Sequence, residues 1–249
     1  MSLDQASTWT PAERDELQHT SLVRHRLEEQ FRDLEQQHEV ASLGMWIFLA
    51  TEVMFFGTLF VGLGVYTYMH HEAFVKASEK LNWLIGGTNT VVLLISSLMI
   101  VLAVHSARVG NQRHLVMFLA LTALLGVCFL CLKGVEYYID WRENLIPGWK
   151  FDAEEWIQRD HLRPEQVPQV QLFLLFYWTM TGLHALHVIL GIGAVLAMAL
   201  LARRGRFSPV YYSPVDVTAL YWHFVDIVWI FLLPMLYLTG THTGADFHF

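Results

Sequence analysis

The sequence predicts an all-α membrane protein, a polytopic bundle of five transmembrane helices. Of its 249 residues, 54% are hydrophobic and 16% are charged, and the mean hydropathy is positive. Five apolar segments reach the length of about 20 residues that a membrane-spanning helix needs. They run from about 41 to 68, 83 to 106, 115 to 139, 172 to 202 and 218 to 239. We therefore expect a five-helix transmembrane domain over 41–249, with an acidic outer loop at 140–171.

The basic residues predict that the amino terminus lies inside and the carboxyl terminus outside. In this orientation nine Lys and Arg residues lie inside and six lie in the outer loops, and membrane proteins carry an excess of basic residues on the cytoplasmic side. The net charge is −7 and the sequence has no basic tract, so we expect no nucleic-acid partner. No phosphate loop, dinucleotide fingerprint or catalytic nucleophile is visible, and we assign no catalytic residue.

The polar amino-terminal segment, 1–40, precedes the first span. Thr10-Pro11-Ala12-Glu13 resembles a capping box with proline at the first helical position, which predicts a surface helix to about Gln37. A frayed polar tail is the alternative.

The first span places Glu52 about 16 Å from its start, at roughly 1.5 Å per residue. A carboxylate near the middle of a bilayer costs roughly 3 kcal/mol on insertion scales. Glu52 should therefore be protonated, hydrogen-bonded to a neighbouring helix, or in contact with water or lipid headgroups. A structural carboxyl without further role is the alternative.

The second and third spans carry polar residues at helical spacing. A stripe of small and polar residues predicts a helix-packing seam in the second span, made by Asn82, Gly86, Asn89, Ser96 and Ala103. His105 and Arg108 follow at its end. In the third span Lys133 and Glu136 are three residues apart and can form an ion pair. Cys128 and Cys131 lie inside the same apolar span, so we interpret them as small packing residues and not as a redox pair.

The fourth and fifth spans contain histidines at membrane depth. His184 and His187 lie three residues apart, on one face with Tyr177, Thr181 and Gly191. His223 and Asp226 have the same spacing, and we expect them to hydrogen-bond each other.

These histidines raise the question of a metal or haem site. The sequence offers no further ligand at fixed spacing beyond Glu52 and Asp226, so we expect no metal and no cofactor in this chain. Interhelical hydrogen bonding is the expected role of His105, His184, His187 and His223. Arginines at the inner helix ends are candidates for contacts with lipid headgroups, namely Arg108, Arg203, Arg204 and Arg206.

Five segments together resemble subunit III of the haem-copper cytochrome c oxidases. They are Thr-Glu-Val-Met-Phe-Phe (51–56), the stretch from Leu-Asn to Val-His-Ser-Ala (81–107), Gly-Val-Cys-Phe-Leu-Cys-Leu-Lys-Gly-Val-Glu-Tyr-Tyr (126–138), Thr-Gly-Leu-His-Ala-Leu-His-Val-Ile-Leu-Gly (181–191) and Tyr-Trp-His-Phe-Val-Asp-Ile-Val-Trp (221–229). They occur in the order of the family and at its approximate spacing.

The resemblance implies a redox-silent subunit of a respiratory oxidase in a bacterial cytoplasmic membrane. Haem and copper are then held by partner subunits I and II. Subunit I is the main contact, phospholipid is bound, and the chain supports sustained proton uptake during oxygen reduction. Glu52 matches the family's carbodiimide-reactive glutamate, with Thr51 in place of the more familiar serine. Many members have seven spans, and this chain resembles a five-span form without the first two.

The sequence is also compatible with other functions. The same family fold serves quinol oxidases and a subunit associated with nitric-oxide reductase. A different class is a stand-alone transporter of protons or small solutes, with Glu52, His184 and Asp226 as a relay. A membrane cytochrome that binds haem by itself is a third class. The expected lack of a complete ligand set disfavours the third, and the lack of internally repeated halves disfavours the second.

Overall fold

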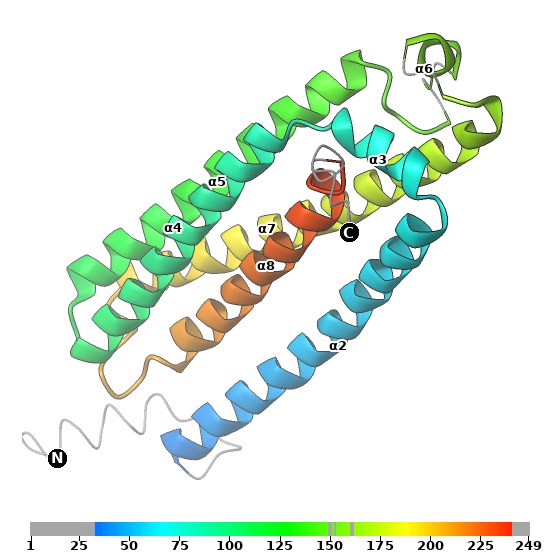
Figure 1. Ribbon diagram of the computed structural model, residues 1–249. Helices are drawn as coiled ribbons and strands as arrows, with labels where there is room; N and C mark the ends of the chain where they lie inside the picture. The colour runs from blue at the N-terminus through cyan, green and yellow to red at the C-terminus, as the bar shows by residue number, and fades with distance from the viewer. Residues whose placement is uncertain (1–32, 149–150, 152, 160–161, 241–249) are drawn as a thin grey trace, which may run out of the picture.

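The computed structural model describes residues 33–148, 151, 153–159 and 162–240 (Figure 1). Its helices are α2 (Leu34–Met69), α3 (His71–Glu79), α4 (Trp83–Val109), α5 (Gln112–Arg142), α6 (Ala153–Arg159), a 3₁₀ turn (Pro164–Gln166), α7 (Val167–Arg203) and α8 (Ser213–Tyr237). Five of them, α2, α4, α5, α7 and α8, are long and apolar enough to cross a membrane. Within the described residues the fold is all-α with five candidate spans, which confirms the predicted fold class.

Side-chain caps explain where several helices begin. The Asp33 carboxylate accepts a hydrogen bond from the Gln36 amide before α2, and Asn82 accepts from the amides of Leu84 and Ile85 before α4. Asn111 does the same for α5 through the amide of His114. Such caps satisfy backbone N–H groups that have no partner within the helix. The turns between these helices are therefore short and well defined.

The helix bounds differ from the expected spans at several ends. α2 begins at Leu34, so its first turns belong to the polar segment. α5 continues to Arg142 and α7 begins at Val167, which shortens the connection expected over 140–171. The surface helix expected from Thr10 lies almost entirely outside the described residues.

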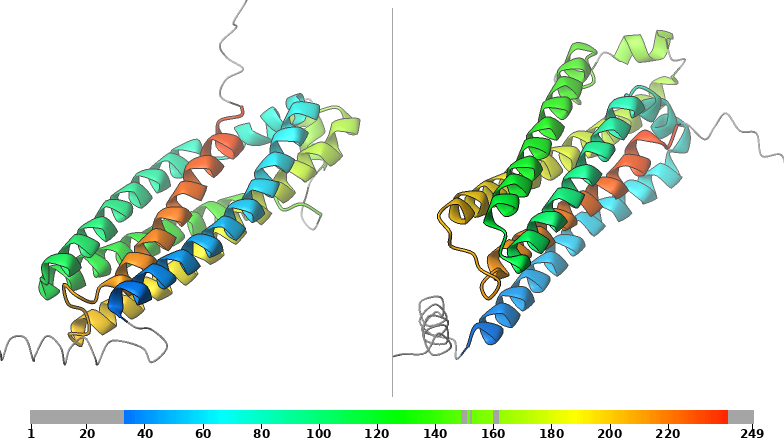
Figure 2. Two further views of the ribbon diagram at one scale, coloured as in Figure 1. Left: turned by 90° about the horizontal axis from the view of Figure 1, so that it is seen from below. Right: turned by 90° about the vertical axis from the view of Figure 1, so that its left-hand side faces the viewer.

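Four helices form the body of the bundle, and α2 lies at its side. α4 and α5 form an antiparallel hairpin, α7 packs along α5, and α8 contacts α4 and α7, while α2 contacts α8 and α7 (Figures 1 and 2). The short helix α3 packs on α7 where α2 ends. We call this end of the bundle, which also carries α6, the α3 end.

Small residues bring the core helices close together. The position of a Cβ at Gly126 on α5 lies 2.7 Å from the Trp222 ring and 2.9 Å from Ile192, and at Gly191 on α7 it lies 3.0 Å from the same ring. In α4, Gly86, Asn89, Ser96 and Ala103 are buried, which confirms this part of the predicted seam. Asn82 is exposed and caps the helix instead.

The outer surface of the bundle is apolar. Along α2, large apolar side chains are exposed, among them Leu43, Trp46, Ile47, Val53, Met54 and Val61. Cys128 and Cys131 are also exposed, so the interpretation that they pack between helices is wrong. The opposite face of α5, with Gly126, Phe129 and Lys133, is the buried one, and this turns the two cysteines outward.

Candidate functional site

Glu52 on α2 contacts His187 on α7. The Oε2 atom of Glu52 lies 3.2 Å from Nε2 of His187, and both side chains are mostly buried. The other ring nitrogen, Nδ1, lies 2.8 Å from the carbonyl oxygen of Leu183. Because a carbonyl oxygen can only accept, Nδ1 is the donor in that bond. The contact with Glu52 therefore joins either a protonated carboxyl with a neutral imidazole or a carboxylate with an imidazolium.

The surroundings of His187 hold this contact in place. The Phe56 ring lies edge-on at 5.2 Å between ring centroids, and the Tyr221 hydroxyl on α8 donates to the His187 carbonyl oxygen at 3.1 Å. Three helices thus meet around one histidine. A hydrogen bond to a neighbouring helix was one of the environments expected for Glu52.

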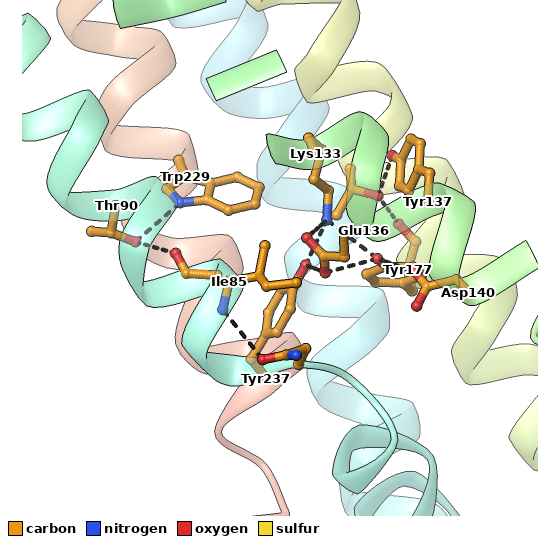
Figure 3. A network of polar contacts seen from close by, with 12 residues as sticks. Ile85, Thr90, Lys133, Glu136, Tyr137, Asp140, Tyr177, Trp229 and Tyr237 are labelled. Carbon is orange, nitrogen blue, oxygen red and sulfur yellow. Dashed lines mark hydrogen bonds and ion pairs between the residues drawn. The ribbon is translucent and has the colours of Figure 1, made fainter. Parts of the chain in front are cut away.

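Lys133 and Glu136 form a buried ion pair on α5 (Figure 3). Their Nζ and Oε2 atoms are 3.1 Å apart, and the side chains are 2% and 1% exposed. Lys133 also donates to the hydroxyl oxygens of Tyr177 on α7, at 3.2 Å, and of Tyr237 on α8, at 2.5 Å. The pair therefore connects three helices inside the bundle.

Asp140 extends this network by one further helical turn. The Tyr177 hydroxyl lies 2.7 Å from Oδ2 of Asp140 and 3.1 Å from Oε1 of Glu136, and the Tyr237 hydroxyl donates to the same Glu136 oxygen at 2.5 Å. We call Lys133, Glu136, Asp140, Tyr177 and Tyr237 the lysine network. Sequence reasoning missed Asp140, which we placed in the loop, and Tyr237. The signal for Asp140 was its spacing of four residues from Glu136.

Aromatic rings surround the ammonium group of Lys133. Its Nζ lies between 4.8 and 5.4 Å from the ring centroids of Tyr137, Tyr177, Trp229 and Tyr237. A cation over an aromatic face is attracted by the negative face of the ring, most strongly where water is excluded. These rings replace part of the hydration that Lys133 loses.

His184 does not make the interhelical hydrogen bond that we expected. It is 1% exposed, and neither ring nitrogen has a hydrogen-bond partner in the described residues. Its ring packs between Phe129, at 5.6 Å, and Trp229, at 5.1 Å. The residues of α5 and α8 that contact His184 are aromatic, so its ring makes packing contacts in place of a hydrogen bond.

The expected hydrogen bond between His223 and Asp226 is also wrong. Nδ1 of His223 lies 2.7 Å from the Ser97 hydroxyl on α4, and both carboxyl oxygens of Asp226 are buried without a hydrogen-bond partner in the described residues. Residues three apart on a helix point roughly 60° away from each other, at about 100° per residue. Here that angle turns Asp226 into the bundle and leaves His223 at a surface groove.

The arginine candidates lie at the end of the bundle opposite α3. Arg108 forms an ion pair with Asp216 at 3.1 Å and lies over the Tyr212 ring. His105 is exposed and lines a surface pocket of about 370 Å³ with Arg108 and His223. Arg203, Arg204 and Arg206 are exposed around the end of α7.

The described residues contain no group of three or more His, Cys, Asp and Glu side chains that could hold a metal ion. His187 and His223 are engaged in hydrogen bonds, and His184 is enclosed by aromatic rings.

Comparisons with known proteins place this arrangement in a family. The family profile described as cytochrome c oxidase subunit III matches residues 171–241. A probable cytochrome c oxidase subunit 3 of Rickettsia bellii is 30% identical over 240 residues, which cover 90% of this chain and 72% of the relative.

Two quinol oxidase subunits are similar as well. A probable quinol oxidase subunit 3 of Staphylococcus haemolyticus is 30% identical over 205 residues, covering 81% of this chain and 90% of the relative. The quinol oxidase subunit 3 of Bacillus spizizenii is 28% identical over 210 residues, covering 83% and 92%. Together with the five membrane-spanning helices, these matches identify the chain as an integral membrane protein that belongs to the cytochrome c oxidase subunit III family.

Proposed function

We propose that this chain is a redox-silent subunit of a respiratory haem-copper oxidase, in which it packs on subunit I, binds lipid and supports sustained proton uptake. The observation that carries the proposal is the Glu52–His187 contact. Its two residues come from 51–56 and 181–191, two of the segments on which the family resemblance depends. An ionisable pair inside a membrane span indicates a functional site.

Haem and copper belong to partner subunits in this proposal. The support is the donor chemistry described above, in which the buried histidines are hydrogen-bonded or packed by rings. We expect the chain to act on the proton and lipid environment of the catalytic subunit and to carry no electron itself.

The lipid role is supported by a groove between α2 and α8. The groove has a volume of about 550 Å³ and is lined almost entirely by apolar side chains, including Phe56, Phe60 and Phe231. An acyl chain matches this lining. Arg203, Arg204 and Arg206 are exposed at the end of α7, where they can contact lipid phosphates.

Cytochrome c is our first candidate for the electron donor, and quinol is the second. One observation favours quinol: this chain spans 90% and 92% of two quinol oxidase subunits but 72% of the Rickettsia bellii cytochrome c oxidase subunit. Oxygen consumption by the purified complex, with either reduced cytochrome c or a quinol, distinguishes the two donors.

The orientation and the membrane are also proposals. The basic-residue count favours an amino terminus inside the cell, in a bacterial cytoplasmic membrane. The α3 end of the bundle, with the lysine network, then faces outward. Gly148→Cys, in a chain whose Cys128 and Cys131 are replaced by serine, tests the orientation. An impermeant maleimide should label this cysteine in intact cells if the α3 end faces outward.

The proton role is tested by the time course of oxygen reduction. We expect a complex with Glu52→Gln and His187→Phe in this chain to begin at the normal rate and then to lose activity sooner during turnover. The matched control is Glu143→Gln, an exposed carboxyl on the same chain. A normal lifetime in the double variant contradicts the proposed role of the contact, and an immediate loss of activity in a fully assembled complex contradicts redox silence.

A further inference from the structure

The lysine network contains one amine and two carboxyl groups, and all three side chains are at most 3% exposed. If Lys133, Glu136 and Asp140 were all ionised, the network would carry a net negative charge. In the described part of the chain, Lys133 is the cation that pairs with Glu136 and also interacts with Asp140. Burying an uncompensated carboxylate is strongly disfavoured, and two carboxyls that share a site do not both ionise readily.

The lysine network has too few N–H and O–H donors to satisfy every observed contact if Glu136 and Asp140 are both carboxylates. The three N–H groups of Lys133 match its three contacts, with Glu136, Tyr177 and Tyr237. Tyr237 donates its hydroxyl hydrogen to Glu136. Tyr177 has a single hydroxyl hydrogen, yet its oxygen lies within hydrogen-bond distance of both Glu136 and Asp140 (Figure 3). Two carboxylates at these distances would compete for one hydrogen atom.

A proton on Asp140 satisfies every one of these contacts. Asp140 then donates to Tyr177, Tyr177 donates to Glu136, and Glu136 remains the anion that balances Lys133. A proton on Glu136 is a poorer solution, because Glu136 is the carboxyl that accepts from Lys133 and Tyr237. Asp140 makes neither of those contacts, so it is the group for the additional proton.

We propose that Asp140 and Tyr177 form a proton-binding site in which Asp140 holds this additional proton as a carboxylic acid. When Asp140 releases its proton, the Tyr177 hydroxyl turns from Glu136 to Asp140, and this rotation reverses when a proton returns. Atoms and charge balance, since one proton leaves and one carboxylate forms. The titratable groups that face Asp140 are Lys133, Glu136 and Tyr137 from α5, Glu143 directly after α5, Tyr177 from α7, and Tyr237 from α8.

Asp140 lies near the end of α5, and its side chain is 3% exposed. It lies two residues before the end of α5 at Arg142, and its carbonyl oxygen accepts a hydrogen bond from Leu145 in the following loop. The proton-binding site therefore lies at the α3 end of the bundle, on helices other than α2, which carries Glu52. It does not depend on the function proposed for Glu52.

Infrared spectroscopy of the full-length chain tests the site, in detergent and with any subunits that accompany it. A carboxylic acid has a C=O stretching band that a carboxylate lacks, and the band shifts in heavy water. We expect Asp140→Asn to remove one such band and Glu165→Gln, at an exposed carboxyl away from Asp140, to remove none. The asparagine amide can donate to Tyr177 as the acid does, so the variant should fold. If Asp140→Asn instead removes only carboxylate bands, the proposal is overturned.

A second variant covers the case in which Asp140→Asn does not accumulate. Tyr177→Phe keeps Asp140 and removes its hydrogen-bond partner, so the C=O band of a protonated Asp140 should move to higher frequency. An unchanged carboxylic acid region in Tyr177→Phe contradicts the proposal. Both readouts are independent of oxidase activity, so their failure can be told apart from failure of the proposed function.

Discussion

Glu52 and Lys133 show two ways in which a membrane protein accommodates an ionisable side chain. Glu52 makes one hydrogen bond to a histidine and remains near the edge of the bundle, whereas Lys133 is enclosed by three oxygen acceptors and four aromatic rings. Removing a charge from water is compensated only when its hydrogen bonds are replaced. The first arrangement leaves a group that reagents can reach, and the second joins helices.

Because Glu52 lies near the edge of the bundle and the lysine network is enclosed, we expect a carboxyl reagent to label Glu52 selectively. A hydrophobic carbodiimide reacts with protonated carboxyls that it can reach from the lipid phase, so we expect Glu52 to take most of the label and Asp140, 3% exposed, to take little. Peptide mass spectrometry locates the label. Glu52→Gln should remove it and Glu143→Gln should not. Unchanged labelling in Glu52→Gln would show that the assignment of the reactive carboxyl is wrong.

For single residues, the sequence predicts which side chains point into the bundle better than it predicts the groups to which they hydrogen-bond. Three-residue spacing on α5 correctly indicated that Lys133 and Glu136 pair, because both point into the bundle. The same spacing failed for His223 and Asp226, since His223 bonds to Ser97 on another helix. Tyr237 and Asp140 belong to the lysine network through hydrogen bonds between helices. Such bonds depend on tertiary packing, which helical periodicity does not predict.

Among the elements, α5 is the one that connects the others. It pairs with α4, packs along α7, and reaches α8 through Gly126 and Lys133. The five spans themselves followed from hydropathy, because each is long and apolar. The packing of α5 between its neighbours depends on where the glycines lie relative to Trp222, which composition alone does not specify.

Adding a methyl group at Gly126 tests this packing. Its Cβ would lie 2.7 Å from the Trp222 ring and 2.9 Å from Ile192, so Gly126→Ala should lower the free energy of unfolding by about 1–3 kcal/mol. Thermal unfolding of the chain in detergent measures the change. Gly134→Ala on the same helix is the matched control, because beyond its chain neighbours and its own helix backbone no atom lies within 4 Å of its Cβ. Equal melting temperatures for the two variants would contradict the close approach of α5 to Trp222.

Removing the ammonium group should separate α5 from α7 and α8. Lys133→Met leaves Glu136 buried without its cation, and breaking a buried pair in this way costs about 3–5 kcal/mol. We expect a lower yield of folded chain by size-exclusion chromatography, with partial recovery when Glu136→Gln is added. Arg142→Met, at the exposed end of the same helix, should have little effect. A double variant as damaged as Lys133→Met alone would show that charge balance is not the cause.

The whole molecule combines a packed body with a peripheral helix. α4, α5, α7 and α8 bury most of the polar groups, while α2 contributes Glu52 and a largely exposed apolar surface. A surface of this kind is stable only against lipid or a partner subunit. Hydropathy predicted the existence of α2 but not its peripheral position, which depends on its contacts with α7 and α8.

The composition of the complex that contains this chain tests the central claim most directly. An affinity tag on the chain, followed by mild detergent extraction and mass spectrometry, should recover a haem- and copper-bearing oxidase subunit in a one-to-one ratio. The visible spectrum of that preparation should show haem, and the chain released from it by harsher detergent should carry neither haem nor copper. Recovery of the chain alone, or haem retained by the released chain, would contradict its assignment as a redox-silent oxidase subunit.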